Sequence, residues 1–163
     1  MKSLSIHFHF SGDIKITQSN AILRYLGRKF ALDGRSEQDR VRVDMMLDNA
    51  MDFRNGFIML SYNPKFNQLK DDYITKLEPT LEKFSKFLAN RKFFSAEYLT
   101  YPDFHMYEML YSHKQLAPRV VEKFRNLVDF IDRMENLPRV SAFLKSNRSP
   151  KPMNNKMAAF GKL

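Results

Sequence analysis

The sequence predicts a mainly α-helical fold that begins with a small ββα unit. Two observations predict this fold class. Residues 6–17 form two short segments with strand-like character, and apolar residues then recur at helical spacing almost to the end of the chain. The chain has 163 residues and no cysteine, so packing alone has to hold its core together.

The first element that we expect is a β-hairpin. Ile6–Phe10 alternates weakly between apolar and polar residues, and Ile14–Thr17 is short and rich in β-branched residues. Ser11-Gly12-Asp13 lies between them and is typical of a compact turn. A two-stranded hairpin is marginal in water without further strands or a helix. We therefore expect it to be part of a larger domain.

A helix is expected next, with Ser19 as its N-cap. Its apolar positions are Ala21, Ile22, Leu23, Tyr25, Leu26 and Phe30. The loop at Leu32–Arg35 then marks a domain boundary, because no helical spacing crosses it. We expect residues 1–31 to form a partial first domain and residues 32–163 to form an all-helical second domain.

The second domain is expected to contain five or six helices. Ser36 with Asp39 is close to a capping box, and the long helix that begins there ends near Tyr62, before Pro64. After a loop, a second helix carries the apolar stripe Ile74, Leu77, Leu81, Phe84 and Leu88. Later helices are expected to start at Thr100 and to span Pro118–Phe124, Leu127–Met134 and Pro138–Lys145, with residues 147–163 as an extended tail.

The net charge of +9 comes mostly from residues 139–163, which contain six basic residues and no acidic one. Such a tail is typical of a solvated surface, and the alternatives are contact with nucleic acid or with an acidic membrane surface. The basic residues are spread out and no platform of stacking aromatic residues accompanies them, so we expect no nucleic-acid partner. No apolar run approaches the roughly 18 residues of a membrane span. We expect a cytoplasmic protein without a membrane partner.

Histidines do not indicate a metal site. His7 and His9 lie two residues apart on one expected strand, but a metal site needs a third and a fourth ligand. His105 and His113 are distant in the sequence and have no supporting pattern of carboxylates. We therefore expect no bound metal.

Gln18 and Ser19 stand where a strand ends and a helix begins. Backbone N–H groups point outward at the positive end of a helix, and a carboxylate is favoured there. The Gln18 amide adds a group that both donates and accepts hydrogen bonds. The alternative is that the pair only caps the helix.

A ββα unit that ends in Gln-Ser and leads into an all-helical domain resembles the cytosolic glutathione transferases. Residues 11–26 resemble the second half of their thioredoxin-like first domain. The mu class is indicated by four further stretches: Ser61–Pro64, Leu99–Phe104, Asn126–Ile131 and Lys156–Gly161. The resemblance covers nearly everything after Gly12.

The resemblance implies roles for individual residues. Gln18 and Ser19 would hold the γ-glutamyl carboxylate of glutathione, and Asp52 would reach the ammonium group of glutathione bound in the partner subunit. Tyr62 would donate a hydrogen bond near the electrophile, and Arg54 and Ile58 would line the electrophile pocket. Taken alone, Asp52 and Arg54 could equally be exposed charges, and Tyr62 and Ile58 could be core residues.

The sequence also departs from the family pattern. The tyrosine that lowers the pKa of the glutathione thiol belongs to a strand–helix–strand segment with no counterpart before Gly12. The family's Asn-Leu-Pro falls on Ser5-Ile6-His7, so Ile6 would pair with the cysteinyl part of glutathione without the usual cis-proline. An aromatic residue near the electrophile pocket is replaced by Asn154.

The resemblance therefore implies a glutathione transferase that conjugates reduced glutathione to small hydrophobic electrophiles as a homodimer. It implies glutathione as a co-substrate and no other cofactor. Because no residue takes the thiol-activating role, we expect little or no conjugation by the 163-residue polypeptide. The alternative is a non-catalytic protein of the same helical fold that binds apolar ligands or other subunits.

Overall fold

The computed structural model describes residues 8–11, 13–149 and 153–161, with side chains from residue 13 onward. This part of the chain contains two strands and seven helices. They are β1 (Phe8–Ser11), β2 (Ile14–Thr17), α1 (Ser19–Lys29), α2 (Glu37–Ser61), α3 (Phe66–Leu88), α4 (Tyr101–Leu116), α5 (Pro118–Val121), α6 (Arg125–Glu135) and α7 (Pro138–Lys145). The predicted fold class, a ββα unit followed by an all-helical domain, is confirmed.

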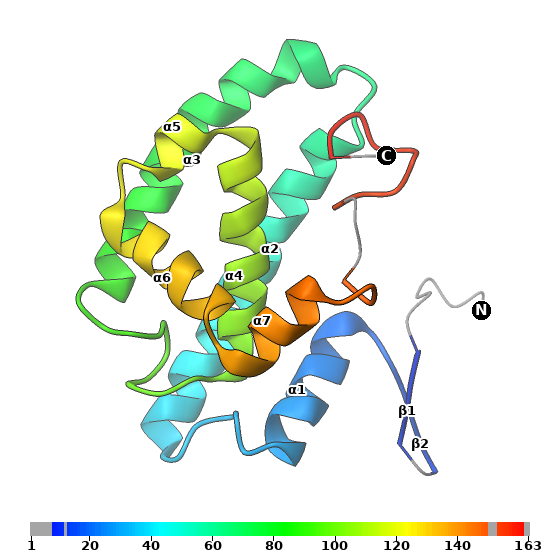
Figure 1. Ribbon diagram of the computed structural model, residues 1–163, viewed down its shortest axis with the longest axis vertical. Helices are drawn as coiled ribbons and strands as arrows, with labels where there is room; N and C mark the ends of the chain where they lie inside the picture. Colours follow the sequence, from blue (N-terminus) through cyan, green and yellow to red (C-terminus); the bar gives the residue numbers. More distant parts are fainter. Residues whose placement is uncertain (1–7, 12, 150–152, 162–163) are drawn as a thin grey trace.

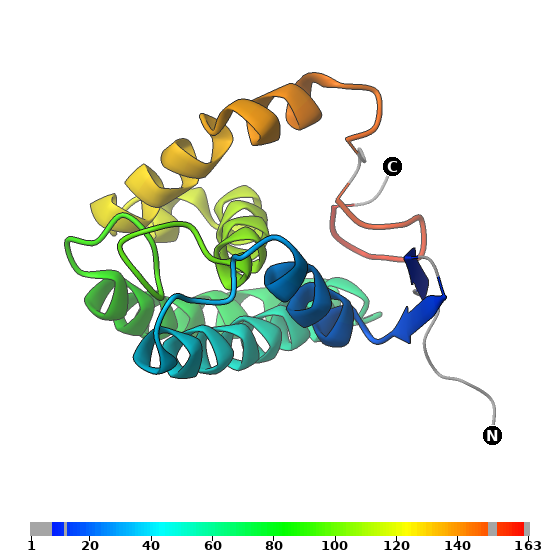
Figure 2. The same cartoon turned by 90° about the horizontal axis from the view of Figure 1, so that it is seen from below.

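Helix α4 occupies the centre of the molecule (Figure 1). It packs against α1, α2, α5 and α6. Figure 2 shows α2 and α3 as a layer on one side of α4 and α6 with α7 as a layer on the other side. The main core lies between these layers and includes the fully buried side chains of Leu81, Met106, Leu110, Leu127 and Phe130. Both α2 and α4 therefore have one face in the core and other faces available for a site.

The hairpin forms, and its first strand ends one residue later than predicted. β1 pairs with β2 in antiparallel register, with Phe8 opposite Thr17 and Ser11 opposite Ile14. Ser11 is therefore a strand residue and not part of the turn, because the turn is only two residues long. The expected strand at Ile6–Phe10 is wrong at its end, and Ile6 itself lies outside the described residues.

Capping boxes fix the starts of α2 and α4, as predicted. The Ser36 hydroxyl accepts a hydrogen bond from the Asp39 N–H at 3.1 Å, and an Asp39 carboxylate oxygen accepts one from the Ser36 N–H at 3.2 Å. At α4, the buried Asp103 carboxylate accepts hydrogen bonds from the Thr100 N–H at 2.8 Å and the Thr100 hydroxyl at 2.7 Å. It also accepts one from the Phe94 N–H at 2.9 Å.

Other element ends differ from the prediction. Ser19 is the first residue of α1 and not its N-cap, because Gln18 takes the capping position. α3 begins at Phe66, almost directly after α2, where a longer loop was expected. α5 ends at Val121, and α6 already begins at Arg125. A short turn between α5 and α6 is closed by the Phe124 N–H, which donates to the Val121 carbonyl at 3.0 Å.

Candidate functional site

The start of α1 has an unusual backbone at Gln18. Its φ of 73° and ψ of 118° lie in a region that residues with a Cβ rarely adopt. No side chain caps α1, and its first turn contains no acidic residue. The side chains of Gln18 and Ser19 are both exposed. The arrangement leaves backbone N–H groups at an electropositive helix end open to an external anion.

Two contacts fix the position of α1 in the molecule. The Arg24 guanidinium donates to Asp48 at 3.0 Å and to Asp44 at 3.4 Å, which connects α1 to α2. Gly27 is buried against Tyr101 of α4, and a Cβ added there would lie 2.2 Å from Cδ1 of that ring. Gly27 therefore permits a close approach of two helices that a side chain would prevent. These contacts hold α1 against α2 and α4.

Asp52 lies on a surface of α2 that no described helix covers. Its side chain is exposed and makes no hydrogen bond or ion pair with another described residue. Three large apolar side chains share this side of α2 with it: Val41, Met45 and Met59 are 51%, 55% and 74% exposed. Exposed apolar side chains around a charge are typical of a protein–protein interface. We call these four residues the open stripe of α2.

Arg54, Ile58 and Tyr62 lie together on a different side of α2. Their four-residue spacing places them on one stripe, and all three are half-buried. Tyr62 is the C-cap of α2, and its N–H donates to the Ile58 carbonyl at 3.0 Å. The structure therefore brings these three predicted residues together and separates them from Asp52.

Arg54 also belongs to a polar cluster with two residues of α4. Burial, with a smaller contribution from the positive charge of Arg54, lowers the pKa of His105 to about 4. Desolvation by surrounding protein atoms raises the pKa of the Glu108 carboxyl, and the positive charge of Arg54 opposes that rise. The His105 Nδ1 atom is buried without a hydrogen-bond partner among the described residues. No spacing in the sequence indicates this cluster, because it depends on the packing of α2 against α4.

The C-terminal loop packs beside this stripe. Phe160 lies against the rings of Phe57 and Phe66, with centroid separations of 6.1 Å and 5.8 Å. The Ala159 N–H donates to the Ser61 carbonyl at 2.6 Å, next to Tyr62. Ile58 packs on the same apolar cluster as Phe160. Phe160 is thus a neighbour of the predicted electrophile residues that sequence reasoning did not assign.

Asn154 closes the C-terminal loop. Its side chain is buried, and its amide donates to the Phe160 carbonyl at 2.9 Å. Its own N–H donates to the Gly161 carbonyl at 2.8 Å, and Gly161 has a positive φ of 69° that suits glycine. The side chain at position 154 therefore points into its own loop, whereas the family's aromatic residue would point toward an electrophile.

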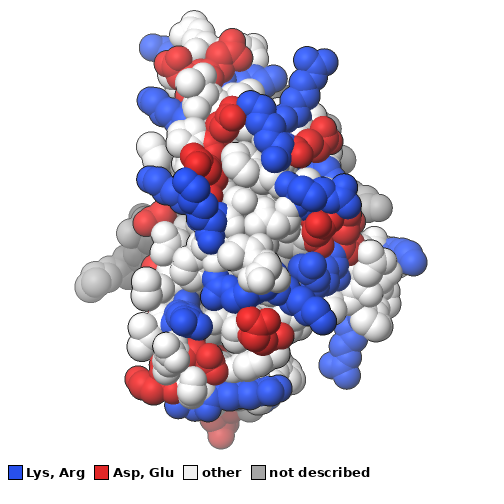
Figure 3. Space-filling model, turned by 90° about the vertical axis from the view of Figure 1, so that its left-hand side faces the viewer, with Lys and Arg blue, Asp and Glu red and all other residues white. Residues whose placement is uncertain are grey.

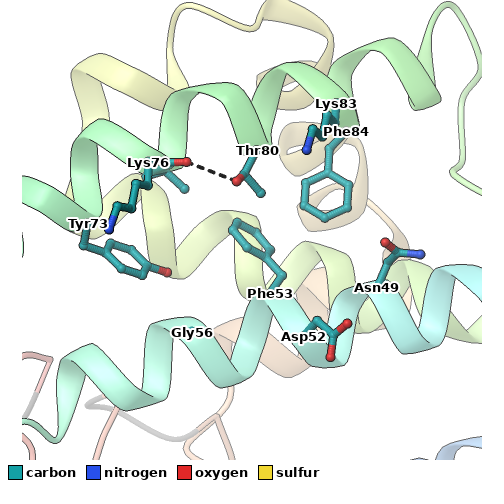
Figure 4. Close-up of a pocket in the computed structure, with 10 residues that line it drawn as sticks. Asn49, Asp52, Phe53, Gly56, Tyr73, Lys76, Thr80, Lys83 and Phe84 are labelled. Carbon is teal, nitrogen blue, oxygen red and sulfur yellow. Dashed lines mark hydrogen bonds between the residues drawn. The ribbon is translucent and has the colours of Figure 1, made fainter.

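A groove between α2 and α3 was not predicted at all. It has a volume of about 420 Å³ and is shown in Figure 4. We call it the α2–α3 groove, and its lining residues are Asn49, Asp52, Phe53, Gly56, Tyr73, Lys76, Leu77, Thr80, Lys83 and Phe84. Asp52 of the open stripe lies at its edge. The groove could not be recognised in the sequence, because its two walls come from different helices.

The part of the chain that the structure describes contains neither a cluster of metal-ligating side chains nor a membrane-spanning helix. No group of three His, Cys, Asp or Glu side chains lies close enough to hold a metal ion there. None of the described helices is both long and apolar enough to cross a bilayer. Figure 3 shows one face of the molecule, on which Lys and Arg side chains are interleaved with Asp and Glu. Such mixing does not favour a polyanion on that face.

Comparisons with known proteins point to one family. A family model described as the C-terminal domain of glutathione S-transferase matches residues 51–147. The chain is 39% identical to glutathione S-transferase Mu 1 of Macaca fascicularis over 158 aligned residues. The alignment covers 96% of this chain and 72% of the relative. It is 40% identical over 158 residues to glutathione S-transferase Mu 1 of Homo sapiens, with the same coverage of 96% and 72%.

Solved structures agree with these relatives. The crystal structure of the glutathione S-transferase Blo t 8 matches with a TM-score of 0.85 and 28% identity, over 94% of this chain and 74% of that one. The pi-class glutathione S-transferase of Onchocerca volvulus matches with a TM-score of 0.81 and 31% identity, over 90% of this chain and 73% of that one. The match extends through most of the described fold.

Proposed function

Because the chain belongs to the glutathione S-transferase family, with mu-class relatives at about 40% identity, we propose that it provides one wall of a mu-like transferase site. In this proposal residues 1–31 belong to a glutathione-binding domain, and residues 32–163 are the helical domain that meets the electrophile. The observation that supports it most is the strained backbone of Gln18 at the start of α1. Strained backbone conformations that the surrounding structure holds in place cluster at binding and active sites.

The proposed glutathione contacts are at the start of α1. The carboxylate of the γ-glutamyl group would accept hydrogen bonds from the first-turn N–H groups and from the hydroxyl of Ser19. The Gln18 amide would complete the contact, because its exposed side chain is able to donate to a carboxylate. Ile6 would pair through its backbone with the cysteinyl part of glutathione.

Asp52 is proposed to act across a subunit interface. It is exposed, and Met45 and Met59 of the open stripe lie on the same side of α2 about 10 Å to either side of it, so a second copy of the chain would bury the stripe and bring the carboxylate to a neighbouring site. There it would pair with the ammonium group of glutathione bound by the partner. A cytoplasmic homodimer is the assembly that this proposal requires.

The proposed electrophile site is the stripe of Arg54, Ile58 and Tyr62. Ile58 offers apolar contact, the Tyr62 hydroxyl is a donor for negative charge that develops on the electrophile, and Arg54 adds a positive charge. Small hydrophobic electrophiles suit this mixture. Phe160 of the C-terminal loop extends the apolar surface beside Ile58.

No residue of the chain is proposed to activate the glutathione thiol. The seven tyrosines are all at position 25 or later, in α1 or in the helical domain. None precedes the α1 start, where the family's activating tyrosine would be. We therefore expect the 163-residue polypeptide to bind glutathione without conjugating it. Turnover of a chromogenic aryl chloride well above the uncatalysed rate would contradict this expectation.

Retention on immobilised glutathione tests the proposed binding site. We expect the wild-type polypeptide to be retained and to be eluted by free glutathione. The substitution Gln18→Ala with Ser19→Ala removes the proposed contacts, and Gln38→Ala, at an exposed position of α2, is the matched control. A polypeptide that flows through, or a double variant that is retained as well as the control, would instead favour a non-catalytic protein of the same fold.

A further inference from the structure

We propose that Asn154 is a positioning residue for the proposed electrophile site. Its buried side chain closes the C-terminal loop, residues 153–161. The closed loop holds the end of α2, where Tyr62 lies, and the ring of Phe160 beside it. This inference rests on the proposed electrophile site and adds to it a residue that acts on Tyr62 without contacting the electrophile itself.

Two hydrogen bonds from Asn154 close the loop. The side-chain amide donates to the Phe160 carbonyl at 2.9 Å, and the backbone N–H donates to the Gly161 carbonyl at 2.8 Å. The Asn154 side chain is only 8% exposed. Because water is largely excluded from this amide, loss of its N–H donor leaves the Phe160 carbonyl poorly compensated. The loop conformation therefore depends on this one side chain.

The closed loop caps the C-terminal end of α2. Carbonyl groups in the last turn of a helix have no partner inside the helix. The carbonyl of Ser61, the last residue of α2, accepts hydrogen bonds from the Ala159 N–H at 2.6 Å and from the Phe160 N–H at 3.4 Å. Figure 1 shows the C-terminal loop beside this end of α2. The loop thus fixes the peptide group that joins Ser61 to Tyr62.

Apolar contacts hold the same loop against the core. The Phe160 ring stacks on Phe66, with centroids 5.8 Å apart and planes 10° apart, and it meets the edge of Phe57 at 6.1 Å. Ala158 is 1% exposed. Ile58 of the electrophile stripe packs on this cluster. A shift of the loop backbone would therefore move an aromatic ring that lies beside Ile58.

Asn155 is the matched comparison for Asn154. It is the next residue in the loop and also an asparagine, but its side chain is exposed. Its Oδ1 atom accepts a hydrogen bond from the Met157 N–H at 3.0 Å, so this bond stays within the loop. The contrast identifies Asn154 as the asparagine that connects the loop to the end of α2.

Binding of 2,4-dinitrotoluene tests the proposal. This molecule has the electron-poor ring of a nitroaryl electrophile but no leaving group, so equilibrium dialysis measures its Kd without a reaction. We expect saturable binding to the 163-residue chain. We expect Asn154→Ala to raise the Kd about three- to tenfold, the factor that one neutral hydrogen bond contributes to an equilibrium. Asn154→Asp keeps the shape but lacks the N–H donor and should cause a similar loss, whereas Asn155→Ala should leave the Kd unchanged.

A double-mutant cycle with Tyr62→Phe distinguishes positioning from a purely structural role. Tyr62→Phe removes the hydroxyl that would donate to a nitro oxygen, and we expect it to raise the Kd about three- to tenfold. If Asn154 holds that hydroxyl in place, Tyr62→Phe should change little once Asn154 is alanine. The double variant should then lie within about twofold of Asn154→Ala alone. Effects that multiply would show that Asn154 does not act through Tyr62.

Amide hydrogen exchange measures the loop without a ligand. The Ala159 N–H should exchange at least about tenfold faster in Asn154→Ala than in the wild type or in Asn155→Ala, while amides of α3 and α6 keep their rates. Unchanged exchange at Ala159, or equally faster exchange in α3 and α6, would overturn the proposal. An unchanged Kd in Asn154→Ala, or an equal effect of Asn155→Ala, would do the same.

The proposed electrophile site and the role of Asn154 fail in different ways. If the wild-type chain does not bind dinitrotoluene, the electrophile site itself is wrong, and the role of Asn154 in it is wrong as well. If the wild type binds and the cycle is multiplicative, only the role of Asn154 is wrong. Retention on immobilised glutathione reports on the start of α1 and should be the same for Asn154→Ala and the wild type.

Discussion

Replacing Gly27 with alanine is expected to destabilise the protein, although alanine is the better helix former. The new Cβ would lie 2.2, 2.9 and 3.0 Å from three ring atoms of Tyr101. That ring cannot easily move, because Tyr101 is only 4% exposed and its hydroxyl donates to Asp44 at 3.1 Å. Gly27 and Tyr101 form the contact that seats α1 on α4, so the whole helix has to shift.

The magnitude follows from two opposing effects. Overpacking a well-filled contact costs about 1–3 kcal/mol. Alanine in place of glycine in a helix returns about 0.8–1 kcal/mol. We therefore expect Gly27→Ala to lower the free energy of unfolding by about 0–2 kcal/mol, and by nearer the upper value because the closest approach is 2.2 Å. Because α1 carries Gln18, we also expect weaker retention on immobilised glutathione.

Gly56 provides the matched control for this substitution. It also lies inside a helix, but its added Cβ would have its nearest neighbours at 3.8 Å, which is ordinary contact. Gly56→Ala should therefore raise the free energy of unfolding by about 0.5–1 kcal/mol. Urea unfolding followed by circular dichroism measures both variants. If Gly27→Ala is as stabilising as Gly56→Ala, the argument from close approach is wrong.

Four further predictions follow from individual side chains. His105→Leu should be neutral or stabilising in urea unfolding, because the buried Nδ1 of His105 has no partner. His113→Leu should cost about 1–3 kcal/mol in the same assay, because the Tyr73 hydroxyl loses its protein partner and the Met109 carbonyl loses one of its two hydrogen bonds. Burial lowers the pKa of His105 and of His113 to about 4 from 6.5, so the unfolded state takes up their protons first as the pH falls. Stability should then decline between pH 6.5 and pH 4 by up to about 1.4 kcal/mol per pH unit for each histidine, and His105→Leu should reduce that slope. Gln18→Gly should relieve the backbone at φ 73° and stabilise the fold by about 1 kcal/mol while glutathione retention falls.

The helix starts could be predicted from the sequence because their determinants are local. Ser36 with Asp39 and Thr100 with Asp103 each place a donor and an acceptor three residues apart, and both boxes form. Pro138 likewise marks the start of α7. Such signals depend on neighbouring residues only, so they do not require knowledge of the tertiary fold.

The start of α1 could not be predicted in detail, because a non-local cause overrides a local preference. Ser19 is the better N-cap by residue type, yet Gln18 takes that position with a strained backbone. The antiparallel pairing of β2 and the seating of Gly27 on Tyr101 fix both ends of the connection. The backbone at residue 18 therefore adopts the φ and ψ angles that join these two fixed ends.

Which residues share one side of a helix follows from the sequence, but the surfaces that face them do not. A four-residue spacing places Arg54, Ile58 and Tyr62 on one side of α2, where all three are half-buried. The neighbours of that side, Phe160 and His105, come from distant segments, so no spacing reveals them. The α2–α3 groove was missed for the same reason.

The two proposed roles on α2, one at Asp52 and one at Arg54, lie on different sides of the helix. Each residue turns an α-helix by about 100°, so Asp52 and Arg54 point roughly 200° apart although only one residue lies between them. The residue between them, Phe53, is buried in the core and stacks on His113 with centroids 3.9 Å apart. Substitutions at Asp52 and Arg54 therefore act on surfaces that share no partner. Their effects on binding should add, because the buried ring between them prevents either surface from adjusting to a change in the other.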